Sequence, residues 1–167
     1  MRYQSVDDRL IPSNIYDSLI SFIPRLKNIE YAKLYPEQQT GDGSIEHPFQ
    51  MPFYEYADVV HEFEKEVYKF EKDHPEFQLN TYNNIFLMNG LRWDEEVMTK
   101  ADVSNANGQV VMALILGAIR AERFCDGTLK DFLELGCIEK WLLRLQEIAS
   151  TRRFMNSRAA LPITRPT

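Results

Sequence analysis

The sequence predicts a mainly α, single-domain helical bundle of about six helices, and three observations support this prediction. Residues 110–119 form an uninterrupted apolar run, which is typical of a helix surrounded by other helices. Elsewhere, apolar residues recur at spacings of three and four, as on one face of a helix. Prolines and glycines separate these stretches, and 167 residues suffice for one buried core.

The first expected helix covers residues 13–26. Ser13 is a suitable N-cap, and Pro24 should bend or end the helix. The expected apolar face consists of Ile15, Leu19, Phe22 and Ile23.

Residues 36–52 are expected to form a loop, because they contain three prolines and two glycines and show little periodicity. A loop of this length is often a lid or a binding segment. A second helix is expected over residues 53–72, before His74-Pro75 breaks it. Its apolar stripe consists of Tyr56, Val59 or Val60, Phe63, Val67 and Phe70.

Residues 77–93 leave two interpretations open. The run from Ile85 to Met88 precedes Asn89-Gly90, so it fits a short strand entering a tight turn or an irregular apolar segment. The fold prediction therefore allows a very short strand pair near 85–93. Asp94 then caps one or two helical turns that reach Lys100.

The remaining helices are expected around a central one at 104–125. Gly127 suits a left-handed helix end, and Thr128 followed three residues later by an acid suits the start of a helix over 129–135. A last helix is expected over 138–149, with Ile138, Trp141, Leu142, Leu145 and Ile148 on one face.

Charge is unevenly distributed along the chain. Residues 1–143 hold 14 basic and 24 acidic side chains, whereas residues 144–167 hold five arginines and one glutamate. We therefore divide the chain into a helical domain, 1–149, and a basic C-terminal tail, 150–167, which we expect to be extended. The acidic body argues against nucleic-acid binding, which needs a basic face, although the tail alone could contact nucleic acid.

The longest uncharged run is ten residues, well short of the roughly 20 that a membrane span needs. The first residues contain acids and no apolar segment, so they do not resemble a secretory signal. The sequence also has only two cysteines, so it does not resemble a disulfide-rich secreted protein. We therefore expect a cytoplasmic protein without membrane contact.

The stretch "RAERFCDG", residues 120–127, is the strongest candidate site. The helix end and glycine stop explain Gly127, and Phe124 and Cys125 are expected in the core. These features do not explain Arg120, Glu122 and Arg123, which together with Asp126 are candidate binding residues. Arg120, Arg123 and Asp126 follow at spacings of three, so they form a charged row on one face. Such a row is either an internal salt-bridge lattice, which we favour because buried charge is normally paired, or an anion-binding edge.

This stretch also carries a family resemblance. The chain resembles a set of small bacterial domains of unknown function, in which an apolar helix runs into Arg-x-(Asp/Glu)-Arg-Phe-Cys-(Asp/Glu)-Gly and two short helices follow. Three other stretches are weaker points of similarity: Met51-Pro52-Phe53 with Tyr56, "SLISFIPRL", and Ala101-Asp102. The resemblance extends over about residues 15–146, and residues 77–93 depart from it because only Trp93 stands near the usual aromatic cluster. It implies the architecture and the choice of motif, and no activity.

Complete catalytic sets are missing from the sequence. His61-Glu62 lacks the second histidine of the zinc-protease pattern, and Gly-rich phosphate loops are absent. Cys125 and Cys137 are expected as small buried residues beyond disulfide reach; an activated Cys125 thiolate is the alternative. Phe132 occupies the position where a helix-turn-helix needs a small residue, so we reject that motif. We expect no metal and no cofactor.

Aromatic residues offer a second candidate site. Tyr54, Tyr56, Phe49 and Phe53 cluster after the loop, and with Trp93 they could line a groove closed by residues 36–52, with the arginines at its edge. The favoured alternative is that these side chains complete the core.

We therefore hypothesise a non-catalytic cytoplasmic binding or assembly module, whose tail, 150–167, is an arm on a sister subunit or partner. The first alternative is an enzyme or small-molecule binder that uses Arg120, Arg123 and Cys125 on an anionic ligand. A weaker alternative is a nucleic-acid accessory protein that acts through its basic tail.

Overall fold

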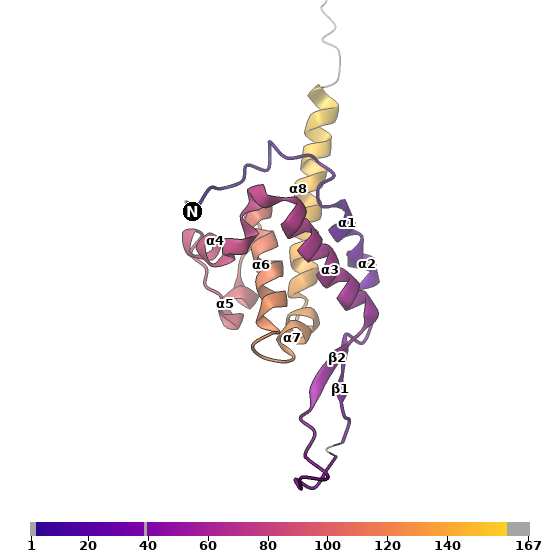
Figure 1. The fold of residues 1–167 in the computed structure, drawn as a ribbon. Helices are drawn as coiled ribbons and strands as arrows, with labels where there is room; N and C mark the ends of the chain where they lie inside the picture. Colours follow the sequence, from indigo (N-terminus) through magenta and orange to yellow (C-terminus); the bar gives the residue numbers. More distant parts are fainter. Residues whose placement is uncertain (1–2, 39, 160–167) are drawn as a thin grey trace, which may run out of the picture.

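A computed structural model describes residues 3–38 and 40–159 and confirms the mainly α fold with a short strand pair (Figure 1). The helices enclose one core, and the two strands form a hairpin at one end. The elements in chain order are α1 (Asp17–Ile20), α2 (Phe22–Arg25), β1 (Ala32–Tyr35), β2 (Phe53–Tyr56), α3 (Asp58–Asp73), η1 (Pro75–Phe77), η2 (Leu79–Thr81), α4 (Tyr82–Met88), α5 (Glu95–Lys100), α6 (Gly108–Ala121), α7 (Thr128–Glu134) and α8 (Cys137–Ala159).

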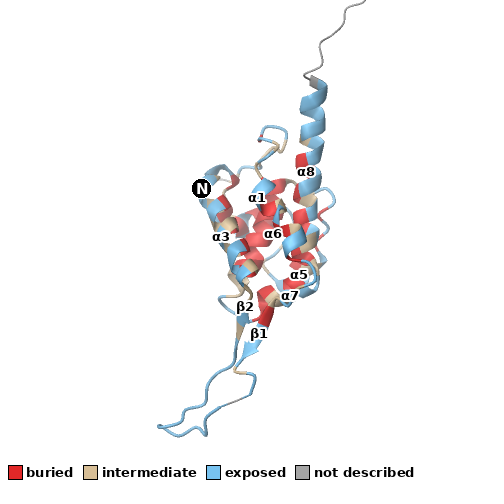
Figure 2. Ribbon diagram, turned by 90° about the vertical axis from the view of Figure 1, so that its right-hand side faces the viewer, coloured by how far each residue is buried: buried red, intermediate tan, exposed pale blue. Residues whose placement is uncertain are grey.

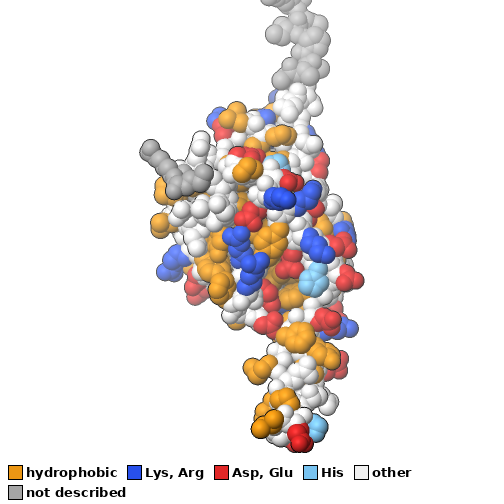
Figure 3. Space-filling model, viewed as in Figure 1, with side chains coloured by type: hydrophobic (Ala, Val, Ile, Leu, Met, Phe, Trp, Pro, Cys, Tyr) orange, Lys and Arg blue, Asp and Glu red, His pale blue; other side chains and the backbone are white. Residues whose placement is uncertain are grey.

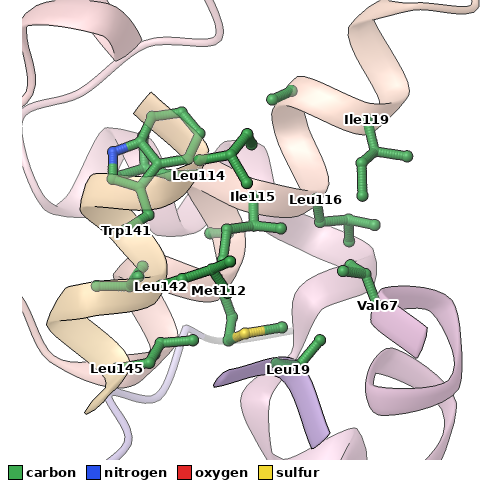
Figure 4. Packing of buried hydrophobic residues seen from close by; sticks show 14 of the residues in the cluster. Leu19, Val67, Met112, Leu114, Ile115, Leu116, Ile119, Trp141, Leu142 and Leu145 are labelled. Carbon is green, nitrogen blue, oxygen red and sulfur yellow. The ribbon is translucent and has the colours of Figure 1, made fainter. Parts of the chain in front are cut away.

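Helix α6 is the centre of the core, as its apolar sequence predicts. Every residue from Gly108 to Ile119 is buried, and α3, α4, α7 and α8 pack around the helix. Figure 4 shows apolar side chains of α6 between those of α8 and α3. It is shorter than predicted, since Asn107 caps its start by accepting a hydrogen bond from Val110 N at 3.0 Å. The side-chain amide of buried Gln109 donates hydrogen bonds to the carbonyls of Gln4 and Phe77, which ties the N-terminal segment to the core.

The predicted first helix is two short segments, α1 and α2, rather than one continuous helix. Ser13 does not cap it, because α1 begins only at Asp17. Pro24 lies within α2, where it has no N–H for the carbonyl of Ile20, and the helix ends one residue later. The predicted face is correct: Leu19 and Phe22 are buried, and Ile15 and Ile23 pack against the core.

The strand pair lies in a different place from the predicted one. Residues 82–88 form helix α4, whereas β1 and β2 pair antiparallel with Lys33 opposite Glu55 and Tyr35 opposite Phe53. Helix α3 therefore starts at Asp58, five residues later than predicted, although its buried residues belong to the predicted stripe. Residues 36–52 connect the strands, so the hairpin arm, residues 32–56, extends beyond the helical body (Figure 1).

The C-terminal prediction is partly wrong. Residues 150–159 are not extended but continue α8 as far as Ala159, while residues 160–167 lie outside the described part of the chain. Proline and glycine are absent between 137 and 159, so nothing ends the helix where its apolar period stops. Figure 2 shows this exposed end of α8 at the opposite pole of the molecule from the hairpin arm.

Two smaller predictions hold. Asp94 caps α5 by accepting a hydrogen bond from Val97 N at 3.0 Å, and His74 ends α3. Over residues 3–38 and 40–159, none of the helices combines the length and apolarity needed to cross a membrane.

Candidate functional site

The four charged residues of the 120–127 motif all contact other residues of the chain. Arg120 donates a hydrogen bond to Glu71 on α3 at 2.7 Å, and its guanidinium lies 5.2 Å from the ring centroid of Tyr82. Both side chains of this ion pair are largely buried. Arg120 therefore links α6 to α3 and α4 and is occupied by the fold.

Glu122 forms the N-terminal cap of the next helix. Its two carboxylate oxygens accept hydrogen bonds from Gly127 N at 2.9 Å and Leu129 N at 2.8 Å. These donors belong to the first turn of α7, which Thr128 was expected to cap and does not. Burial raises the pKa of Glu122, and the two backbone donors oppose that shift.

The base of the hairpin arm is attached to the same turn. Asp126 accepts a hydrogen bond from Tyr54 N at 2.9 Å, and the hydroxyl of Tyr56 accepts one from Lys130 N at 3.0 Å. Successive side chains of β2 point to opposite faces of the hairpin. Tyr54 and Tyr56 therefore both face the body, while Phe53 and Glu55 are exposed. Burial and the nearby Glu122 carboxylate raise the pKa of Tyr56, which keeps its hydroxyl protonated.

Gly127 allows this close approach. Its φ is +91°, a left-handed conformation that favours glycine, and a Cβ there would lie 2.6 Å from Cε2 of Tyr54. The motif is thus a joint between α6, α7 and the hairpin. Among the described residues Arg120 is held by an ion pair, whereas Glu122 and Asp126 accept backbone hydrogen bonds and do not form the expected salt-bridge lattice.

Arg123 differs from the other charged residues. It donates a hydrogen bond to the hydroxyl of Tyr68 at 3.0 Å and stacks over that ring, and it has no acidic partner among the residues that the structure describes. It borders an open groove of about 600 Å³ between α3 and the end of α6. The groove is lined by Asp58, His61, Glu62, Glu64, Lys65, Tyr68, Ile119, Glu122 and Arg123.

Phe124 and Cys125 are not core residues, contrary to the prediction. Phe124 is 78% exposed and packs edge-on against Trp93, and Cys125 is exposed, whereas Cys137 is buried as expected. The turn that follows α6 faces solvent, so neither residue continues the buried face of that helix. Both line a separate hollow of about 210 Å³ together with Trp93 and Phe132.

The predicted aromatic groove is not formed. Trp93 donates a hydrogen bond to Gly117 O at 2.9 Å and packs on Tyr82, whereas Tyr54 and Tyr56 contact the start of α7. Residues 36–52 extend away from the body instead of closing over it (Figure 1). Arg123 and Cys125 also border different hollows, so the structure does not assemble the proposed Arg/Cys cluster.

Sequence reasoning missed the exposed apolar residues of the hairpin arm. They are visible as hydrophobic side chains along the hairpin in Figure 3, and they comprise Leu34, Tyr35, Ile45, Phe49, Met51 and Phe53. The exposed end of α8 carries two more, Phe154 and Met155. Four of the six, Ile45, Phe49, Met51 and Phe53, lie in segments that were predicted as a loop or a helix, which hid their common surface.

Within the described ranges, three or more histidine, cysteine, aspartate or glutamate side chains do not come together in a way that would hold a metal ion. In a comparison with known families, the model of DUF6508, a family of unknown function, matches residues 11–151. Neither the curated proteins nor the solved structures contain a match. Since the match extends over most of the sequence, the chain belongs to the DUF6508 family.

Proposed function

We propose that this protein is a non-catalytic cytoplasmic assembly module that holds a protein partner through its hairpin arm and the exposed end of α8. The observation that carries the proposal is the exposure of six large apolar side chains on the arm. Contiguous exposed apolar residues on a soluble protein are typical of an interaction surface.

The arm has little support from the body beyond its base. Asp126 and Lys130 hold Tyr54 and Tyr56, but all described residues of the 37–52 connection are exposed. A two-stranded hairpin in water is only marginally stable by itself. A partner that covers Tyr35 and Phe53, whose rings lie 5.5 Å apart, would stabilise it.

The motif residues contribute by orienting the arm. Glu122 and Asp126 fix the first turn of α7 and the backbone of β2, so the arm leaves the body in one direction. A rigidly oriented arm loses less entropy on binding than a loosely attached one. Two free thiols, one of them exposed, are compatible with a reducing compartment such as the cytoplasm.

Photo-crosslinking in the cells that make the protein tests this proposal. The photoreactive analogue of phenylalanine is placed at Phe49 on the arm, at Phe154 on α8, and at Phe124, which is more exposed than either, as a control on the body. We expect crosslinked protein species from Phe49 and Phe154 but not from Phe124. Equal yields at all three positions, or no adducts from the two projections, would contradict the proposal.

The groove beside Arg123 supports a second candidate function, the binding of a small anionic ligand. Arg123 and Lys65 both line it, and neither has an ion pair with an acidic residue in the described part of the chain. Native mass spectrometry of the freshly purified protein would detect a bound anion. A ligand that is lost in Arg123→Ala, with the fold intact, favours this function; an apo spectrum for the wild type removes it.

A further inference from the structure

The two projections of the molecule carry opposite charge. The arm, residues 32–56, contains four acidic residues, Glu37, Asp42, Glu46 and Glu55, and one basic residue, Lys33. From residue 150 to residue 159 the end of α8 contains three arginines and no acid. Both projections also expose large apolar side chains, so each is suited to cover the other.

The two surfaces of one chain cannot meet, because they lie at opposite poles of the body (Figures 1 and 2). We infer that the arm of one copy binds the end of α8 of a second copy, in an antiparallel dimer. This inference rests on the proposed function and names its partner.

Symmetry favours a closed dimer over a chain of copies. A two-fold axis perpendicular to the long axis places each arm beside the other copy's helix end, which makes two identical contacts at once. The second contact forms within a complex that already exists, so it adds affinity without a second association step. A head-to-tail string would gain only one contact for each added copy.

The arginines of α8 differ in their availability for this contact. Arg153 forms an ion pair with Asp17 of its own chain, so it is partly occupied. Arg158 lies 5.2 Å from the ring centroid of Phe154 one helical turn earlier, and within the described ranges it has no acidic partner. Arg158 with Phe154 thus forms a combined basic and apolar surface, which matches the acidic and apolar composition of the arm.

The first experiment measures the mass of the full chain by sedimentation equilibrium over a range of concentrations. We expect a monomer–dimer equilibrium that raised ionic strength weakens, because exposed charges are screened by salt. Arg158→Glu should weaken the dimer about tenfold or more, since it places like charges in contact. Lys72→Glu, the same charge change at an exposed position of α3, is the matched control and should leave the dimer unchanged.

A charge-swap experiment tests the antiparallel arrangement itself. One chain carries Arg158→Glu, and the other carries Glu37→Lys with Glu46→Lys. Each chain alone should dimerise poorly, because both of its contacts are unfavourable. Their mixture should form a heterodimer, because one contact then keeps its native charges and the other has both signs exchanged.

The outcomes separate this inference from the proposed function. A wild-type monomer at all concentrations, a ladder of higher oligomers, or a mixture that does not associate would overturn the antiparallel dimer. Crosslinks from Phe49 to a different protein would leave the proposed function in place while overturning the second copy as partner. Every substituted side chain is exposed, so we expect each variant to fold. Circular dichroism checks this expectation.

Discussion

At the scale of single residues, the 120–127 motif serves the structure more than it forms a pocket. Glu122 accepts two backbone hydrogen bonds at the start of α7, and Arg120 is paired with Glu71. Arg123 borders the groove beside α3, which Glu122 also lines, and among the described residues it has no acidic partner. The charged residues of one short stretch therefore have different roles, and substitutions should separate them.

Glu122→Ala should destabilise the protein strongly. It leaves the N–H groups of Gly127 and Leu129 without their acceptor, and losing hydrogen bonds to a charged group costs about 2–3 kcal/mol. Urea denaturation at neutral pH measures this loss. Glu134→Ala, which removes an exposed carboxylate paired with Lys130, should cost less than about 1 kcal/mol; equal effects would show that Glu122 is not a cap.

The pH dependence of stability should reflect the raised pKa of Glu122. Between the ordinary value of 4.5 and the higher folded pKa, the folded state binds more protons at this site than the unfolded chain. The contribution of this site to stability is therefore greatest at low pH and falls as the pH rises through that interval. We expect the free energy of unfolding of Glu122→Gln, which cannot titrate, to lack this downward component when urea curves are compared from pH 4.5 upward.

Alanine substitution of Arg120 and of Arg123 should lower the free energy of unfolding by different amounts. Arg120→Ala removes one partner of a largely buried ion pair and should cost about 3 kcal/mol. Arg123→Ala removes an exposed side chain that bonds only a tyrosine hydroxyl, and it should cost about 1 kcal/mol or less. Thermal unfolding of the two variants decides this, and a larger loss for Arg123 would place it in the structural lattice.

At the scale of elements, periodicity predicted which faces are buried better than where elements begin and end. The predicted apolar stripe of α3 and the predicted burial of α6 on all sides are both correct, because the spacing of apolar residues reflects which faces of a helix are buried. The end of α8 was missed because a helix without an apolar face has no such signal, although its residues still favour helix.

The strand pair and the cap on α7 were missed for a different reason. Strands β1 and β2 are each four residues long, and each pairs with a strand about twenty residues away along the chain. Local sequence patterns do not predict such a pairing. Glu122 lies five residues before the donor of Gly127, outside the usual capping spacing. Phe124 is apolar yet exposed, because the chain turns away from the core directly after α6.

Gly127 and Gly136 offer a matched comparison at the junctions of α7. Both have positive φ, +91° and +73°, but only at Gly127 would a Cβ meet another group, at 2.6 Å from Tyr54. Gly136→Ala should therefore cost about 1–2 kcal/mol from backbone strain alone. Gly127→Ala should cost more and should displace the arm, which hydrogen exchange at the amide of Tyr54 would reveal; equal costs would mean that the arm yields without strain.

At the scale of the whole molecule, the arm is the part that folding explains least. It exposes apolar side chains, adds a connection of seventeen residues between Tyr35 and Phe53, and contributes little to the core. Closing so long a loop costs more entropy than closing a short one. Its presence is easier to understand if a partner covers it.

Replacing residues 36–52 by Asn-Gly tests whether the arm serves assembly and not folding. Tyr35 and Phe53 are opposite each other in the register, so a two-residue turn can join them and keep β1 and β2. The shorter connection should stabilise the monomer by about 2 kcal/mol through reduced loop-closure entropy. Thermal unfolding should therefore show an unchanged or raised midpoint, while sedimentation shows that the dimer is lost. A shortened chain that unfolds more easily would make residues 36–52 part of the folded core, and one that still dimerises would exclude these residues from the interface.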